Sequence, residues 1–161
     1  MHERAVANAG PLVALSLLGR LDLLPSIFRE VWIPEAVQKE VLAGLGRPGA
    51  SELQSPEWSA RVRIAPASDP LLVAELDRGE AAVISMARHL SPCVAVIDER
   101  RGRRIATSVY GLPVKGTVGL LIEAKRRNLS GDLRPMLLAL KSAGYFVADA
   151  IVEAACRSVG E

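Results

Sequence analysis

The run CVAVID (residues 93–98) places the tightest constraint on what this chain can fold into. Five apolar residues stand in succession before a carboxylate, whereas a strand with one solvated face alternates apolar and polar residues. A continuous run of this kind is typical of a strand that is buried on both faces, as strands are in a parallel sheet covered by helices. The chain is therefore expected to place helices on both sides of a sheet.

The rest of the sequence alternates between strand and helix patterns, as crossover connections require. Residues 5–10 are predicted to form a short strand followed by a turn, and further strands are predicted at about 29–33 and 112–116. The segment 61–66 is predicted to form a short strand or an extended lead into the next helices. Helices are predicted at 11–24, 34–44, 69–77, 79–90, 98–111, 117–128, 132–144 and 148–160. The segment 45–60 is rich in Gly, Pro and Ser, which favours a loop or a short helix that forms a lid. We predict one α/β domain over 1–161: a three-layer α/β/α sandwich around a mostly parallel sheet.

Composition narrows the function classes only a little. A net charge of +2 does not by itself mark a nucleic-acid binder, so the position of the charges matters more than their sum. Cys93 and Cys156 lie far apart in apolar runs and are expected to be buried free thiols. No apolar stretch reaches the roughly 18 residues that a membrane span needs, so we expect a cytoplasmic protein that does not engage a membrane.

Acidic and amide side chains stand where a parallel sheet binds ligands, outside the carboxyl ends of its strands. Asn8 ends the first predicted strand and Asp98 ends the apolar one, while Glu80 opens a helix and Glu40 lies inside another. Each has a structural explanation as well: Glu80 suits the helix dipole, Glu40 a solvated face, Asn8 a turn, and Asp98 a helix cap. Singly, none of the four identifies a site.

In order along the chain, these positions resemble the PIN-domain family. The resemblance rests on AVANAGPLVALSLLGRLDLLP, VWIPEAVQKEVL, RGEAAVISMA and VAVIDERRGRRIA, each an element of the family with its acidic position. The tail VKGTVGLLIEAKRRNL resembles a prokaryotic branch of PIN-like proteins that is largely uncharacterised. The likeness spans nearly the whole chain, and 45–60 is its least matched segment.

Membership of that family implies metal-dependent hydrolysis of RNA, often by the toxin of a toxin–antitoxin pair. Carried over by position, Glu40, Glu80 and Asp98 match the catalytic acids, and with Asn8 they would hold Mg²⁺ or Mn²⁺. Both ions prefer hard oxygen ligands, which explains why carboxylates from several elements converge in such a site. The bound metal would activate a water and neutralise the leaving oxygen.

The chain departs from the family pattern at Asn8, where most active members have Asp. An amide oxygen still binds Mg²⁺ but brings no charge, so the metal site is expected to be weakened. Glu99 is a possible auxiliary acid, although a first-turn helix residue is its alternative role.

A run of four arginines follows Asp98, and they are predicted to contact RNA phosphates: Arg100, Arg101, Arg103 and Arg104. The alternative for such a run is a solvated helix face. The basic residues at 125–127 end a helix and are interpreted as structural. Thr117 is expected to cap a helix, and it and Lys115 are weak site candidates.

The expected partners are RNA, a small antitoxin protein and a second copy of the chain in a homodimer. Apolar residues of the first helices, such as Leu15, Leu18 and Leu21, are expected to pack onto the sheet, and an excess of such residues would form a homodimer interface or an antitoxin groove. Two other functions remain open. One is a catalytically inactive PIN-like module that binds RNA or protein. The other is a nucleotide-binding α/β domain, for which NAGPL is a poor phosphate loop because it has a single Gly followed by Pro.

Overall fold

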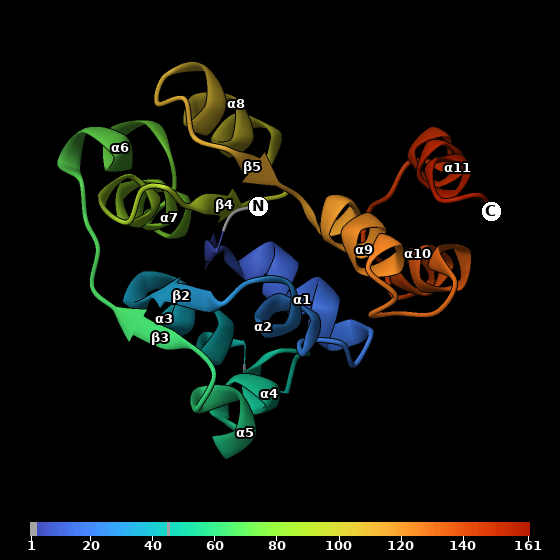
Figure 1. Cartoon of the computed structure of the whole chain (residues 1–161). Coiled ribbons are helices and arrows are strands. Elements are labelled where there is room, and N and C mark those ends of the chain that lie inside the picture. The colour runs from blue at the N-terminus through green and yellow to red at the C-terminus, as the bar shows by residue number, and fades with distance from the viewer. Residues whose placement is uncertain (1–2, 45) are drawn as a thin grey trace.

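A five-stranded parallel sheet forms the centre of the computed structural model, which describes residues 3–44 and 46–161 (Figure 1). The strand order is β3-β2-β1-β4-β5, and every neighbouring pair is parallel. The strands are β1 (Arg4–Ala7), β2 (Glu30–Pro34), β3 (Arg63–Ala65), β4 (Val94–Val96) and β5 (Val114–Lys115). The predicted α/β sandwich with a parallel sheet is confirmed.

Helices connect successive strands and cover the sheet. They are α1 (Ala9–Leu17), α2 (Leu23–Ile27), α3 (Glu35–Ala43), α4 (Ala50–Gln54), α5 (Pro56–Ser59), α6 (Pro70–Glu75), α7 (Arg78–His89), α8 (Arg100–Ser108), α9 (Thr117–Arg126), α10 (Leu133–Ser142) and α11 (Asp149–Ser158). Within residues 3–44 and 46–161, no helix is long and apolar enough to cross a membrane.

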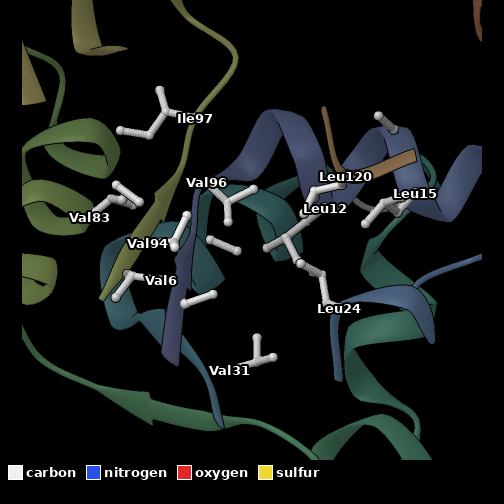
Figure 2. Packing of buried hydrophobic residues seen from close by; sticks show 14 of the residues in the cluster. Val6, Leu12, Leu15, Leu24, Val31, Val83, Val94, Val96, Ile97 and Leu120 are labelled. Atoms are coloured by element: carbon white, nitrogen blue, oxygen red, sulfur yellow. The ribbon is translucent and has the colours of Figure 1, made fainter. Parts of the chain in front are cut away.

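The core lies on both faces of the sheet, as the run at 93–98 predicts. Figure 2 shows Val83 of α7 on one side of the strands, and Leu12, Leu24 and Leu120 from α1, α2 and α9 on the other. Val94, Ala95 and Val96 are all fully or almost fully buried. Both cysteines are buried and free, as expected. Burial on two faces explains why β4 carries no polar residue before Asp98.

The predicted single helix over 11–24 is wrong, because the chain reverses at Gly19. Gly19 has φ 63 and its N–H donates to the Ser16 carbonyl at 2.9 Å, while the N–H of Arg20 donates to the Leu15 carbonyl at 2.8 Å. This pair of bonds is the Schellman motif that ends a helix at a left-handed residue. The pattern therefore splits into α1 and α2.

The segment 45–60 contains two short helices, α4 and α5, and residue 45 lies outside the described residues. Leu53 and Trp58 are buried and join the main core. Ser55 caps α5, accepting from the Trp58 N–H at 3.2 Å. The segment is thus packed against the body of the protein, and its role as a lid stays a prediction.

Candidate metal and nucleic-acid site

Asn8 and Asp98 both lie at the carboxyl edge of the sheet, because they follow the neighbouring parallel strands β1 and β4. The N–H of Asn8 donates to the Val96 carbonyl at 3.0 Å, which continues the ladder one residue past β1. Parallel strands end at the same edge, so the side chains that follow them share one region. The local sequence therefore brings the amide and the carboxylate to the carboxyl edge of the sheet.

The side chain of Asn8 is buried, but it does not cap the helix that follows it. It occupies the N-cap position of α1, yet it makes no capping hydrogen bond. Only 6% of the residue is exposed, and its Oδ1 has no hydrogen-bond donor among the described residues. A buried acceptor left in this state costs about 1–3 kcal/mol. Among the described residues, the Asn8 side chain therefore contributes no hydrogen bond to the turn in which it stands.

Three oxygen-bearing side chains surround Gly79 at the start of α7. A Cβ atom on Gly79 would lie 2.8 Å from Oε2 of Glu40, 3.3 Å from Oδ1 of Asn8 and 3.5 Å from Oδ1 of Asp77. The absence of a side chain at this glycine lets α3, α7 and the end of β1 approach each other. Glu40 and Asn8, two of the predicted site residues, therefore lie close to the same glycine, and Asp77 lies beside it as well.

Asp77 is an acid that the sequence interpretation missed. Its carboxylate caps α7, because Oδ1 accepts from the Glu80 N–H at 2.8 Å. The signal was available: Asp followed three residues later by Glu marks a helix start. Its charge also acts on both neighbouring acids, as their pKa values show.

Glu80 is the most deeply buried acid of the site, with 6% of its surface exposed. Burial, followed by the negative charge of Asp77 and then that of Glu99, raises the pKa of Glu80 to about 7. Its Oε1 has no donor in the described chain and lies 2.7 Å from where a Cβ of Gly102 would stand. The carboxyl group thus points at α8, held between two helices without a counter-charge.

Glu40 reaches the same region from a more open position on α3. The residue is exposed at the surface, but its carboxyl end is partly desolvated. Desolvation, with a smaller contribution from the charge of Asp77, raises the pKa of Glu40 above its ordinary value. The pKa values of both Glu40 and Glu80 are raised because each carboxyl group is partly desolvated and lies near other carboxylates.

Asp98 is held by three donors. Its Oδ1 accepts from the Thr117 N–H at 2.7 Å, and its Oδ2 accepts from the Thr117 hydroxyl at 2.6 Å and from the Tyr145 hydroxyl. The prediction that Thr117 caps its helix is wrong: Gly116 is the N-cap residue, and Thr117 is the first residue of α9. Its hydroxyl instead donates a hydrogen bond to the carboxylate of Asp98.

Tyr145 is the second residue of this region that the sequence did not reveal. α10 ends in a Schellman motif, in which Gly144 adopts φ 88 and the Tyr145 N–H donates to the Leu140 carbonyl at 2.9 Å. This reversal sends Tyr145 back toward the sheet. Burial, and then the charge of Asp98, raise the pKa of Tyr145 well above its ordinary value, so the phenol stays a donor.

The four arginines of α8 have different surroundings. Arg103 is half-buried and its Nη1 donates to the Ile97 carbonyl at 3.1 Å, beside Asp98. Arg101 is exposed and pairs with Glu75 at 3.1 Å. Arg100 and Arg104 are exposed on the same helix. The run is therefore not a uniform cationic face: one guanidinium turns inward and one is partly neutralised.

The other charged candidates include two lysines in salt bridges, an arginine that binds a backbone carbonyl, and the exposed Glu99. Lys115 pairs with Glu123, and Lys125 with Asp132 at 2.8 Å. Nη1 of Arg127 donates to the Ile27 carbonyl at 2.9 Å, so the structural interpretation of 125–127 is supported. Glu99 is exposed at the N-cap position of α8 and makes no capping bond.

The oxygen atoms of this region are of the chemical kinds that bind a hard divalent cation. Within residues 3–44 and 46–161, no three His, Cys, Asp or Glu side chains lie close enough together to hold a metal ion as they stand. However, the donor set consists of carboxylates and one amide, and Asn8 Oδ1 and Glu80 Oε1 are buried acceptors without donors. Mg²⁺ and Mn²⁺ take oxygen ligands of these kinds.

Comparison with known families identifies the family of the chain. A family model described as a PIN domain matches residues 4–161. The chain belongs to the PIN-domain family. No curated protein and no solved structure matches it significantly.

PIN domains have a nuclease-type fold, and the match covers every strand of this sheet as well as the helices that carry the candidate acids. It also includes α10 and α11, so Tyr145 lies inside the family region of this PIN domain. The family match identifies no ligand and no reacting residue.

Proposed function

We propose that this PIN domain is a metal-dependent ribonuclease whose metal site is weakened by Asn8. One observation carries the proposal: Asn8 Oδ1 and Glu80 Oε1 are buried acceptors without donors among the described residues, and a Cβ on Gly79, next to Glu80, would lie within 3.3 Å of both Asn8 Oδ1 and Glu40 Oε2. Buried oxygen atoms without donors are costly in a folded chain unless a cation or another donor satisfies them.

In this proposal Asn8, Glu40, Glu80 and Asp98 hold Mg²⁺ or Mn²⁺. When bound, such an ion lowers the pKa of a coordinated water and neutralises charge on a phosphate oxygen. The chain itself orients the ligands: Thr117 and Tyr145 fix the Asp98 carboxylate, and Asp77 fixes the start of α7 and so the position of Glu80.

The expected weakness of the site follows from charge. Asn8 supplies a neutral oxygen where a carboxylate would add a negative charge, so metal affinity should be lower and a two-metal site is disfavoured. Glu80 adds to this effect, because its pKa of about 7 means that a proton competes with the metal near neutral pH.

RNA contacts are assigned to the arginines of α8. Arg100 and Arg104 are the exposed pair and would neutralise phosphates, while Arg101 would first have to leave Glu75. Arg103 lies closest to Asp98 and would meet a phosphate at the acids. We extend the proposal to a cytoplasmic toxin acting as a homodimer and controlled by a small antitoxin protein; the presence of a small DNA-binding protein in the neighbouring gene would support this extension.

A second candidate function is a non-catalytic module that binds RNA or protein through the same region. Two observations favour it: the acids within the described residues do not form a metal-holding group of three, and the Asp98 carboxylate already accepts three hydrogen bonds. Asn8 is consistent with either function.

Calorimetric titration with Mn²⁺ decides between them, with Asp98→Asn as the matched control. The ribonuclease proposal expects binding that is lost in the control, followed by Mn²⁺-dependent cleavage of a mixed single-stranded RNA pool. Absence of binding at millimolar Mn²⁺ in both the wild type and Asn8→Asp contradicts it and leaves the binding module.

A further inference from the structure

A pocket of about 300 Å³ lies at the amino ends of β2 and β3, on the opposite edge of the sheet from the candidate acids. Three arginines line it, together with one acid and apolar residues: Arg29, Arg61, Arg63, Glu30, Val31 and Val62. We call it the arginine pocket. Sites for small ligands usually span about 300–1,000 Å³, so the pocket has room for a compact ligand group. Nothing in the family match assigns it a role.

The arginine pocket concentrates the positive charge of the chain. Its three arginines and one glutamate give the lining a net charge of +2, which equals the net charge of the whole sequence. Between Trp58 and Ser68 the sequence contains no acidic residue that could neutralise Arg61 or Arg63. Such a concentration of like charges raises the local electrostatic potential and attracts an anion.

Within the described residues, no carboxylate forms a salt bridge with any of these three guanidinium groups. All three arginines are exposed. Glu30, the acid in the lining, is already engaged, because its Oε2 accepts from Arg4 Nε at 3.1 Å and from Trp32 Nε1 at 3.2 Å. The pocket therefore offers three guanidinium groups to an incoming anion.

Buried aromatic residues anchor the backbone at two of the arginines. Arg29 directly follows Phe28, which is buried in the core at the end of α2. The N–H of Arg61 donates to the Trp58 carbonyl at 2.9 Å, and the Trp58 side chain is buried as well. Both arginines therefore stand on backbone that the core holds in place, which lowers the entropic cost of ordering them around a ligand.

Arg63 is held by Trp32. Its guanidinium carbon lies 5.4 Å from the centroid of the Trp32 ring, a cation–π contact. Trp32 and Glu30 share one face of β2, because they are two residues apart. The hydrogen bond from Trp32, and then the charges of Arg4 and Arg63, hold the pKa of Glu30 below its ordinary value. Arg63 is therefore oriented toward the part of the pocket that Glu30 lines.

We infer that the arginine pocket binds a small ligand through a diphosphate group. All three cations are arginines, whose planar fork donates two hydrogen bonds to one phosphate, and three forks match a group with several phosphate oxygens. A compact diphosphate fits a pocket of about 300 Å³, whereas successive phosphates of a nucleic acid are separated by a ribose and extend beyond it. The inference goes beyond the proposed function, because the site lies at the other edge of the sheet and needs no metal.

Arginine side-chain NMR of the full chain in EDTA tests this site without any metal. The probe is inorganic pyrophosphate, the comparison is inorganic orthophosphate, and the reporters are the Nε–Hε signals of Arg29, Arg61 and Arg63. Pyrophosphate is expected to shift all three signals saturably and to bind about tenfold more tightly than orthophosphate. Absence of saturable shifts at millimolar pyrophosphate overturns the inference.

Matched variants separate a built site from general attraction to a basic protein. Arg29→Gln should weaken pyrophosphate binding about tenfold, read from the Arg61 and Arg63 signals. Arg157→Gln removes the same charge from an exposed position of α11 and should change the affinity by about twofold or less. Arg29→Lys keeps the charge without the fork and should restore only part of the affinity. Equal weakening by Arg29→Gln and Arg157→Gln overturns the inference.

A single-stranded RNA with hydroxyl groups at both ends tests the other source of phosphate. RNA that shifts the three arginine signals at higher concentration than pyrophosphate, or leaves them unchanged, supports a small diphosphate ligand. RNA that shifts them at lower concentration shows that the pocket contacts a nucleic-acid backbone, and it overturns the inference. Because EDTA removes the metal, neither result bears on the ribonuclease proposal, which has its own Mn²⁺ titration.

Discussion

The hydroxyl of Tyr145 donates a hydrogen bond to Oδ2 of Asp98, joining the C-terminal helices to the edge of the sheet across 47 residues of sequence. The same oxygen accepts from the Thr117 hydroxyl at 2.6 Å. Asp98 is therefore oriented by groups that follow it in the chain by 19 and 47 residues. Its position depends on the packing of α9 and α10 as much as on β4.

Tyr145→Phe tests this support. The change removes one hydrogen bond to an ionised group, and we expect the free energy of unfolding to fall by about 1–2 kcal/mol, as measured by urea denaturation. Asp98→Asn should lower the pKa of Tyr145, because it removes the negative charge that opposes ionisation of the phenol. Ultraviolet titration of the tyrosines follows this shift; an unchanged profile in Asp98→Asn would contradict the contact.

Two helical glycines provide a matched test of how tightly Glu80 is held. A methyl group at Gly102 would lie 2.7 Å from Glu80 Oε1, whereas one at Gly119 has nothing within 4 Å among the atoms described. Gly119→Ala should stabilise α9 by about 0.5–1 kcal/mol through helix propensity and leave Mn²⁺ affinity unchanged. In Gly102→Ala that gain is offset, because the methyl must displace a buried carboxyl group.

The diagnostic readout is metal affinity rather than stability. If Glu80 is a ligand, Gly102→Ala should weaken Mn²⁺ binding about tenfold or more by calorimetry, a change of about 1.4 kcal/mol. Equal Mn²⁺ affinities of Gly102→Ala and Gly119→Ala would remove Glu80 from the metal site.

The sequence predicted the sheet well because β4 and its flanking helices are specified locally. A continuous apolar run ending at Asp98 has few alternatives, and the helices that start at Glu35 and Arg78 carry clear start signals. The helix pattern over 11–24 was harder to interpret, since apolar spacing continues through Gly19 and only the left-handed turn there divides it.

The site was predictable in part for the same reason. Asn8 and Asp98 follow strands, so their place at one edge of the sheet could be inferred from the parallel order. Tyr145 could not be inferred, because its contact with Asp98 depends on where α10 packs, and no spacing within the sequence specifies that. Asp77 was missed although its capping pattern was visible, because a capping acid has a sufficient structural explanation on its own.

Glu80 should make the stability of the metal-free chain depend on pH. Its pKa is about 7 in the folded state against an ordinary value of 4.5, so the folded state binds the proton more tightly. The stabilisation is complete below the ordinary value and is lost as the pH rises through about 7. Over that window the wild type should lose at most about 3 kcal/mol relative to Glu80→Gln, which has no proton to release.

Urea denaturation in EDTA from about pH 5 to about pH 8 measures this difference at each pH. Because both proteins share all other titrating groups, their difference reports Glu80 together with its effect on the neighbouring acids Asp77 and Glu99. Parallel stability curves for the two proteins would show that the burial of Glu80 does not perturb its ionisation.

Asn8→Asp should have opposite effects with and without metal. In EDTA the new carboxylate faces Glu40 and the buried Asn8 environment supplies no donor for its oxygen, so the melting temperature should fall. With Mn²⁺ the added charge should tighten binding by about tenfold or more, and the melting temperature should rise above that of the metal-bound wild type. A variant that is destabilised in EDTA and gains nothing from Mn²⁺ would show that these oxygens meet for a reason other than metal binding, and the non-catalytic module would then be the better account of this PIN domain.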